Sequence, residues 1–372
     1  MGGLNRLILE GFKSIRTMDL HLSPLTVLIG ANGAGKSNLL SFFRMLNAVS
    51  AGNLQRFVGE QGRANALLHY GRKRTPQMSA TMEFDTTNGK NTYKLSLIGV
   101  APDDLMFADE EVSFTPATTG STPKPSHLGG GHRESRLPDA VNAGNITART
   151  VKWTVDRWRF YHFHDTSPAA PIKQTCSIKD NRLLRTDGAN LSAFLYMLKT
   201  AYHDHYERIR DTIRLAAPFF DDFILEPDEA NPNSIYMEWR ETGSDTPLFA
   251  HQLSDGTIRF IALTTLLLQP DLKNRPLLVL IDEPELGLHP YAITLLASML
   301  QTASKRFQII VSTQSVTLLD QLEETESVVV VDRENGQSVF RRLNESTLET
   351  WLEEYSLGEL WTKNVLGGRP SP

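Results

Sequence analysis

The sequence predicts an α/β protein with a central, mostly parallel sheet, and three observations support this prediction. A short apolar segment, residues 26–29, leads into a glycine-rich loop that is followed by a helical pattern. A fully apolar segment, residues 277–281, ends in two carboxylates, which is typical of a central parallel strand covered on both faces. Residues 307–311 and 327–331 are further apolar segments, separated by a helical pattern, so the whole indicates a doubly wound sheet.

The glycine-rich loop, residues 30–37, reads GANGAGKS and matches the phosphate-binding pattern G-x-x-x-x-G-K-[ST] at every defined position. Strand, loop and helix in this order let backbone N–H groups and a helix N-terminus converge on a phosphate chain. We expect Lys36 to reach the β- and γ-phosphates and the Ser37 hydroxyl to coordinate Mg²⁺. A chance glycine-rich turn is the alternative, and the flanking strand and helix argue against it.

Two carboxylates, Asp282 and Glu283, follow the apolar segment 277–281. They lie at the end of a predicted strand where α/β sheets bind ligands. We expect Asp282 to hold Mg²⁺ through water and Glu283 to orient or deprotonate an attacking water. An ordinary acidic surface turn would be the preferred interpretation if the phosphate-binding loop were absent.

Composition excludes several classes of protein. The chain has 372 residues, a formal net charge of −5 and one cysteine, Cys176, so an internal disulfide framework is excluded. The net charge gives no global basic footprint for nucleic acid, and we interpret the densest basic run, residues 72–74, as a solvated turn. No apolar run has the length of a membrane helix, so we expect a cytoplasmic protein without membrane contact.

The N-terminal part is expected to be rich in strands. Residues 4–9 and 18–22 are predicted strands that precede the one at 26–29. Residues 78–84 and 93–97 alternate apolar and polar side chains around an Asn-Gly pair, which predicts a hairpin and a small antiparallel β region.

The middle of the chain is less regular. Residues 115–145 are rich in Pro, Gly, Ser and Thr and are expected to form a mobile loop, whereas residues 150–163 and 234–239 are predicted strands. Apolar residues recur in steps of three and four over residues 191–213, which predicts one long amphipathic helix. The pair of histidines within residues 162–165 lacks further metal ligands at a usable spacing, so we favour a structural or nucleotide-side role.

Five motifs in this order resemble the ATP-binding-cassette (ABC) ATPase heads of the SMC and RecF kind, in their small prokaryotic AAA-like subgroup. GFKSI resembles the opening strand-turn, GANGAGKSN the Walker A motif, LSDGT the signature, LLVLIDEPELGLHP the Walker B motif with its D-loop, and VSTQS the switch segment. The resemblance covers both ends of the chain well and the middle poorly.

The resemblance implies a P-loop NTPase head with an antiparallel β subdomain and a helical lid, which binds ATP and Mg²⁺. It implies a homodimer in which two copies sandwich two nucleotides, with Glu283 and Gln314 as catalytic residues and Ser37 and Asp282 as metal ligands. The implied nucleotide contacts are Asn32, Gly33, Ala34, Gly35, Lys36, Ser37 and Asn38 of one copy and Ser254 and Gly256 of the other.

The expected organisation has four parts. Residues 1–50 form the N-terminal part of the ATPase lobe, residues 51–165 a β-rich subdomain with the mobile loop, residues 166–250 a helical lid, and residues 251–372 the C-terminal part of the lobe.

The chain departs from the family pattern at three points. Asp255 stands where the commonest signature has glycine, and Gln314 stands where many relatives carry histidine. Because glutamine cannot become cationic, we expect hydrolysis to be slow or stimulated by a partner. The Q-loop glutamine has several candidates, which are Gln61, Gln77, Gln174 and the segment near His164 and Asp165.

The resemblance implies an ATP-dependent switch that engages DNA, as in DNA repair or phage defence. The alternatives are a regulatory module that holds or releases a separate effector protein and, less favoured, the nucleotide-binding subunit of a transporter. The chain carries neither a long heptad arm nor room for a nuclease domain after the switch segment, so we do not expect a nuclease in this polypeptide.

Overall fold

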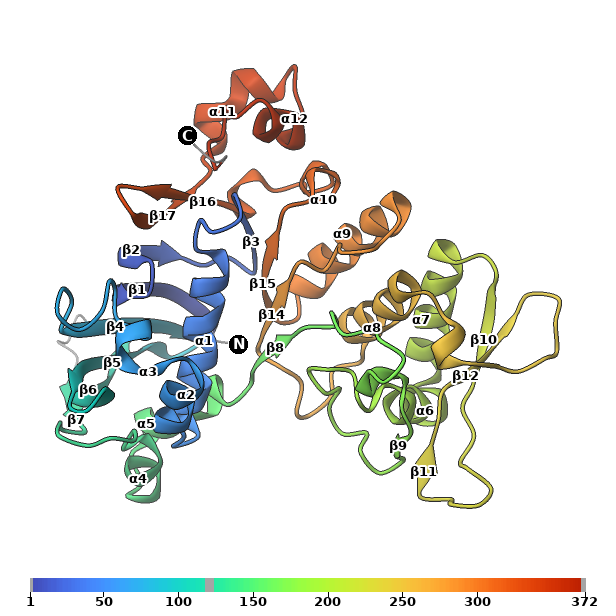
Figure 1. The fold of residues 1–372 in the computed structure, drawn as a ribbon, viewed down its shortest axis with the longest axis horizontal. Helices are drawn as coiled ribbons and strands as arrows, with labels where there is room; N and C mark the ends of the chain where they lie inside the picture. Colours follow the sequence, from blue (N-terminus) through green and yellow to red (C-terminus); the bar gives the residue numbers. More distant parts are fainter. Residues whose placement is uncertain (1–2, 118–123, 369–372) are drawn as a thin grey trace. The chain divides into compact units, whose positions relative to one another are not determined.

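The computed structural model describes residues 3–117 and 124–368 and divides into two compact units (Figure 1). The first unit contains Met1–Trp158, Thr325–Glu349 and Lys363–Pro372. The second unit contains Arg159–Glu324 and Thr350–Thr362. Each unit is therefore assembled from segments that are far apart in the sequence.

An antiparallel six-stranded sheet forms the β-rich part of the first unit. Its strands, in spatial order, are β2 (Ile15–His21), β1 (Leu4–Phe12), β4 (Gln77–Thr86), β5 (Gly89–Val100), β6 (Asp104–Pro116) and β7 (Lys124–His127). The predicted hairpin is confirmed, because β4 and β5 pair from Gln77↔Ile98 to Thr86↔Gly89 across the Asn-Gly turn. The predicted strands near residues 4–9 and 18–22 are also confirmed as β1 and β2.

The strand that leads into the glycine-rich loop is β3 (Leu25–Ile29), and all five of its residues are buried. It pairs in parallel with β16 (Val328–Glu334), which pairs in antiparallel with β17 (Gln337–Arg342). The loop after β3 therefore begins beside a hairpin that lies about 300 residues later in the chain.

Helix α1 (Lys36–Ser50) packs into the core of the first unit through aromatic side chains. The ring centroids of Phe12 and Phe42 are 5.5 Å apart, and those of Phe43 and Trp158 are 5.3 Å apart, both edge-on. Edge-to-face pairs of this kind add to the stabilisation that burial alone provides. The shorter helices nearby are α2 (Leu54–Glu60), α3 (Arg63–Leu67) and α4 (Leu137–Asn142).

The strand predicted over residues 150–163 is wrong in its first half. Residues 146–155 form helix α5 (Ile146–Val155), and only β8 (Trp158–Tyr161) is extended. The Asn145 side chain caps the helix by accepting a hydrogen bond from the Ala148 N–H at 2.9 Å. Ala148, Val151 and Val155 are buried at helical spacing, so packing outweighs the β-branched composition.

The mobile loop predicted over residues 115–145 is corrected in part, because the structure places two regular elements within it. Residues 118–123 lie outside the described part, and β7 and α4 lie in the remainder. The fully buried Glu110 carboxylate anchors the segment, since it accepts hydrogen bonds from Ser135 Oγ at 2.5 Å and from the Arg136 N–H at 2.9 Å. A third donor is the Tyr93 hydroxyl at 2.6 Å.

The second unit contains the strand that ends in the two predicted carboxylates. β14 (Leu278–Asp282) pairs in parallel with β15 (Gln308–Thr313), and the register places Asp282 opposite Ser312. The prediction of parallel apolar strands is thus confirmed here. Helices α8 (Asp255–Leu268), α9 (Pro290–Ser304) and α10 (Val316–Asp320) belong to the same unit.

The single long helix predicted over residues 191–213 is wrong, because the chain forms two helices, α6 (Leu191–Ala201) and α7 (His203–Ala216). Tyr202 breaks the helix with φ −138° and ψ 54°. Apolar residues keep steps of three and four on both sides of this break, so their periodicity could not reveal it.

The strand predicted over residues 234–239 is also divided, into β11 (Ser234–Ile235) and β12 (Glu238–Glu241). The remaining elements are β9 (Cys176–Ser177), β10 (Phe220–Ile224), β13 (Leu248–Phe249), α11 (Glu345–Leu352), α12 (Leu357–Thr362) and the 3₁₀ turns η1 (Pro171–Lys173), η2 (Ala250–Gln252) and η3 (Thr325–Ser327). Among the described helices, none has the length and apolarity needed to cross a membrane.

Candidate functional site

The glycine-rich loop, residues 30–37, lies in the first unit between β3 and α1. Two of its glycines are required by positive φ angles and by close contacts, with a backbone atom at Gly30 and with side-chain atoms at Gly35. A Cβ atom on Gly30 (φ +150°) would lie 2.1 Å from the Val331 carbonyl oxygen. A Cβ atom on Gly35 (φ +123°) would lie 2.1 Å from Ser338 Oγ. The β16–β17 hairpin therefore forms a wall that shapes this loop.

The Lys36 side chain is buried inside the loop that precedes it. Its Nζ atom donates hydrogen bonds to the carbonyl oxygens of Gly30 at 2.5 Å and Ala31 at 3.2 Å. The ammonium group thus lies where a phosphate chain would offer stronger, charged acceptors. On the outer side, the Ala31 N–H donates to the Gly368 carbonyl oxygen at 2.7 Å, so the C-terminal segment also supports the loop.

The other residues predicted to contact phosphate lie in the same loop and in the first turn of α1. Ala34 is buried, whereas Asn32, Gly33 and Ser37 are exposed. An exposed hydroxyl in the first helical turn can coordinate a metal ion, so the position of Ser37 fits the predicted role.

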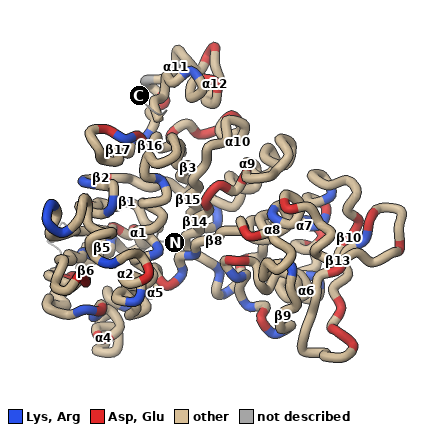
Figure 2. Tube along the Cα trace, in the orientation of Figure 1, with Lys and Arg blue, Asp and Glu red and all other residues tan. Residues whose placement is uncertain are grey.

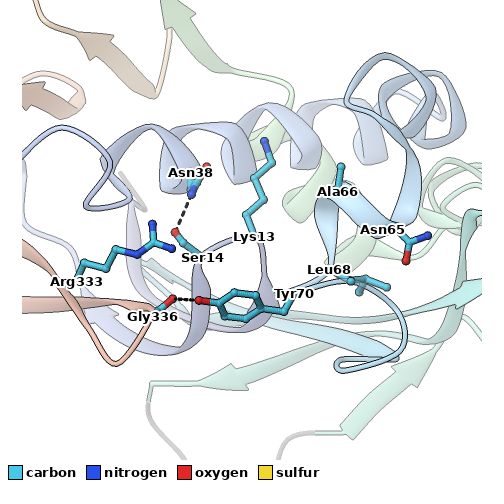
Figure 3. Close-up of a pocket in the computed structure, with 10 residues that line it drawn as sticks. Lys13, Ser14, Asn38, Asn65, Ala66, Leu68, Tyr70, Arg333 and Gly336 are labelled. Carbon is cyan, nitrogen blue, oxygen red and sulfur yellow. Dashed lines mark hydrogen bonds between the residues drawn. The ribbon is translucent and has the colours of Figure 1, made fainter.

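A pocket of about 480 Å³ lies within the first unit beside this loop (Figure 3). The residues that line it include Lys13, Ser14, Asn38, Tyr70, Arg333 and Gly336. Asn38 Nδ2 donates to Ser14 Oγ at 2.7 Å, and the Tyr70 hydroxyl donates to the Gly336 carbonyl oxygen at 2.8 Å, as Figure 3 shows. Its volume falls in the range of small-molecule sites.

Asn38 is the one of these lining residues that was predicted as a site residue from the sequence; Lys13, Tyr70 and Arg333 are among those that were not. Arg333 Nη1 donates to the Gly33 carbonyl oxygen at 3.2 Å, which connects the pocket to the glycine-rich loop. The Arg74 guanidinium lies 4.7 Å from the Tyr70 ring centroid, so one member of the basic run 72–74 makes a cation–π contact. Burial and the nearby Arg44 lower the pKa of Lys13.

The predicted catalytic residues meet in the second unit, where β14 and β15 end. Gln314 Nε2 donates a hydrogen bond to Glu283 Oε1 at 2.7 Å. The Glu283 N–H donates to the Ser312 carbonyl oxygen at 2.7 Å, and its φ of +43° lies in the left-handed region. Non-glycine residues in that region often occur at functional sites. The structure thus places Glu283 and Gln314 in direct contact.

Glu285 lies beside this pair and was not predicted as a site residue. Its Oε1 atom accepts hydrogen bonds from Thr313 Oγ1 at 2.6 Å and from the Gln314 N–H at 3.1 Å. Burial, and to a lesser extent the charge of Glu283, raise the pKa of Glu285, while the hydrogen bonds oppose that shift. The only available sequence signal was a second glutamate in the segment DEPE.

The predicted signature residues begin helix α8. Ser254 caps the helix through its Oγ atom, which accepts from the Thr257 N–H at 3.1 Å. Gly256 approaches the D-loop so closely that a Cβ atom would lie 2.3 Å from the Gly287 carbonyl oxygen. Asp255 is exposed and forms an ion pair with the buried Lys173 at 3.4 Å.

Arg259 connects this helix to two loops of the second unit. Its guanidinium donates to the carbonyl oxygens of Phe163 at 3.0 Å and His164 at 3.3 Å, and also to that of Leu286. His164 Nε2 in turn lies 2.9 Å from the Asp282 carbonyl oxygen. The segment near His164, one of the Q-loop candidates, is therefore next to the predicted metal ligand.

The glutamines considered for the Q-loop have other contacts. Gln61 Oε1 accepts from Lys13 Nζ at 3.2 Å, and Gln174 Nε2 donates to the Pro168 carbonyl oxygen at 3.0 Å. Gln77 begins strand β4. The Q-loop assignment thus stays a prediction.

A family model described as "AAA domain, putative AbiEii toxin, Type IV TA system" matches residues 25–320. A search among curated protein sequences finds no match.

Among solved structures, the chain is similar to an SMC head bound to the C-terminal winged-helix domain of ScpA, with TM-score 0.60 and 16% identity over 92% of this chain and 99% of that one. It is also similar to an SMC head with an extended coiled coil bound to the C-terminal domain of ScpA from Pyrococcus furiosus, with TM-score 0.58 and 16% identity over 95% and 99% of the two chains. The predicted α/β fold of a P-loop NTPase is confirmed by this likeness.

Proposed function

Since the chain belongs to that AAA-domain family and has the fold of an SMC head, we propose that it binds ATP with Mg²⁺ and hydrolyses it as a dimeric switch. An ATPase of the AAA and SMC-head type is the class that the comparisons support. The observation that carries the proposal is the Glu283 carboxylate, which follows the buried strand β14 and is held by Gln314 at 2.7 Å.

In the proposed bound state, the phosphates lie in the glycine-rich loop. Lys36 exchanges its bonds to the Gly30 and Ala31 carbonyl oxygens for bonds to phosphate oxygens, which are charged and therefore better acceptors. Ser37 and Asp282 are the residues that would hold Mg²⁺. The ion, when bound, would neutralise negative charge on the phosphates.

We place the nucleoside in the pocket beside the loop. Its polar lining and volume suit a base and a sugar, and the Tyr70 ring offers a face for a base. The lining also includes Asn38 and Arg333, which contact Ser14 and the Gly33 carbonyl oxygen respectively. This pocket lies entirely in the first unit, as the loop does.

For hydrolysis, we assign Glu283 as the group that orients water and accepts its proton. The Gln314 carboxamide donates one hydrogen bond to Glu283 and stays neutral throughout, so it can align the carboxylate but cannot supply a positive charge. Slow turnover, or turnover that a partner stimulates, is therefore the expected behaviour.

The switch itself is proposed to be a homodimer closed by ATP. In this arrangement Ser254 and Gly256 at the start of α8 contact the nucleotide held by a second copy. Differential affinity of ATP for the closed dimer would then drive closure, and hydrolysis would release it.

The biological role that we propose is phage defence or DNA repair, which is compatible with the toxin–antitoxin system named in the family description. Figure 2 shows Lys and Arg interspersed with Asp and Glu along the described chain, and the net charge is −5. This distribution offers no extended basic stretch in the described part, which is the feature that would favour binding to DNA. Control of a separate effector protein is therefore the second candidate.

The test is the mass of Glu283→Gln by light scattering, with and without Mg-ATP, together with the ATPase rate of the wild type. We expect the variant to bind ATP, to lose turnover and to double in mass. Glu353→Gln, an exposed glutamate in the C-terminal part, is the matched control and should behave as the wild type. Unchanged turnover in Glu283→Gln would refute the catalytic assignment, and unchanged mass would refute the ATP-closed dimer. Duplex DNA that stimulates wild-type turnover would favour the DNA-engaging role over the effector role.

A further inference from the structure

Glu285 connects the loop after β14 to the segment after β15. The two strands are in register up to Asp282 and Ser312, and the backbone bond from Glu283 N–H to the Ser312 carbonyl oxygen extends this pairing by one residue. Beyond that point the two segments are joined by the Glu285 side chain, because Glu285 Oε1 accepts hydrogen bonds from both Thr313 Oγ1 and the Gln314 N–H. Glu285 thus fixes the backbone from which the Gln314 side chain projects.

We propose that Glu285 is a positioning residue for hydrolysis: by holding Thr313 and the Gln314 backbone, it sets the Gln314 carboxamide against the Glu283 carboxylate. This inference rests on the proposed ATPase function. Glu285 acts through Gln314 and makes no contact of its own with the attacking water or the phosphates in this assignment.

The two oxygens of Glu285 have different environments, and this difference bears on its role. Oε1 has two donors, at 2.6 and 3.1 Å. Oε2 is buried and has no hydrogen-bond partner among the residues that the structure describes. A neutral side chain of the same shape that keeps an acceptor at Oε1 should therefore preserve the contact, since no bond depends on the charge at Oε2.

Loss of the contact should affect the catalytic step more than the fold. The ladder between β14 and β15 does not involve Glu285, so the strands remain paired without it. The Gln314 N–H, however, would lose its acceptor, and the Gln314 side chain would no longer have one fixed direction. A misplaced group near the reacting atoms lowers kcat, because alignment matters most in the transition state.

The proposal is tested by measuring kcat and KM for ATP hydrolysis in three variants, which are Glu285→Ala, Glu285→Gln and Thr313→Val. We expect Glu285→Ala to lower kcat about tenfold or more with KM changed less than about twofold. Glu285→Gln should stay within about threefold of the wild type, which a general base in this position would not allow. Thr313→Val removes one of the two donors and should lower kcat less than Glu285→Ala.

The double variant Glu285→Ala/Thr313→Val tests whether Glu285 and Thr313 act through the same contact. If Glu285 acts partly through Thr313, the losses in Glu285→Ala/Thr313→Val should be smaller than the product of the single losses. Equal kcat in Glu285→Ala and the wild type, or equal losses in Glu285→Ala and Glu285→Gln, would overturn the proposal.

Hydrogen exchange measures the same contact without any turnover. In the nucleotide-free protein, the peptide that spans residues 312–316 should exchange faster in Glu285→Ala than in the wild type, and at the wild-type rate in Glu285→Gln. Unchanged exchange in Glu285→Ala would overturn the proposal even if the protein proved not to hydrolyse ATP. Loss of the proposed ATPase function, by contrast, would appear as wild-type turnover no faster than that of Glu283→Gln.

Discussion

Two glycines of the same loop provide a matched pair for testing how the loop is shaped. Gly33 and Gly35 both have positive φ, at +81° and +123°. A Cβ atom on Gly33 would meet no atom within 4 Å among the described residues. A Cβ atom on Gly35 would lie 2.1 Å from Ser338 Oγ and 2.8 Å from Ser338 Cβ, so rotation of the serine side chain alone cannot relieve the clash.

These contacts set the expected cost of each substitution. Alanine in a left-handed conformation costs about 1–2 kcal/mol, which Gly33→Ala should show alone. Gly35→Ala must also displace Ser338, whose Oγ atom donates to the Ala34 carbonyl oxygen at 2.5 Å and shares a hydrogen bond with Ser14 Oγ at 2.6 Å. At about 1 kcal/mol for each bond, Gly35→Ala should lower the free energy of unfolding by about 3–4 kcal/mol in total.

Urea unfolding of the nucleotide-free protein, followed by circular dichroism and tryptophan fluorescence, measures the difference. Ser338→Gly removes the atoms that the new Cβ atom would meet, so the double variant Gly35→Ala/Ser338→Gly should be destabilised by less than the sum of the single effects. If Gly35→Ala were no less stable than Gly33→Ala, the wall formed by the β16–β17 hairpin would not constrain the loop, and the reasoning would fail.

Two further predictions concern charged groups. Lys36→Ala removes the cation of the phosphate site. The Kd for a fluorescent ATP analogue should therefore rise about 10- to 150-fold, as a charge-assisted bond of about 1.5–3 kcal/mol implies, and wild-type affinity would refute the phosphate site. Burial raises the pKa of Glu285 above its ordinary value near 4.5, so the folded state holds this proton more tightly than the unfolded chain. The stabilisation from protonated Glu285 is therefore present below pH 4.5 and is lost as pH rises through the raised pKa. Urea unfolding of the wild type and Glu285→Gln across this range should show the wild type losing stability relative to the variant, and a difference that stays constant or grows in favour of the wild type would contradict this.

The structural features that the sequence predicts best are those formed by residues adjacent in the chain. The strand, glycine-rich loop and helix around Lys36 form one contiguous pattern, and the structure contains all three. The carboxylates after β14 are likewise adjacent in the sequence. Local patterns of this kind depend on backbone geometry that a few residues fix by themselves.

What the sequence did not predict depends on long-range packing. Tyr70 and Arg333 meet around one pocket, although they lie on opposite sides of a long stretch of chain. The Glu285 carboxylate accepts a hydrogen bond from the hydroxyl of Thr313, which belongs to the neighbouring strand. No short-range pattern encodes such contacts, and polar residues of these types are ordinarily assigned to the surface.

The secondary-structure prediction for residues 150–155 failed because composition and periodicity disagreed there. The segment before Trp158 is rich in β-branched and aromatic residues, yet Val151 and Val155 share one buried helical face and Asn145 caps the helix. Their spacing of four residues was present in the sequence and carried more information than the composition.

The support of the glycine-rich loop by Ser338 and Gly368 bears on the order of events during synthesis. The loop leaves the ribosome about 300 residues before its wall and its outer support are made. A nascent chain that stops before residue 338 has Lys36 without the geometry that would hold a phosphate. If ATP binds this loop as proposed, it can assist folding only after these later residues have been made. We therefore expect the growing polypeptide to reach its early structure without this ligand, and an interrupted product not to retain ATP.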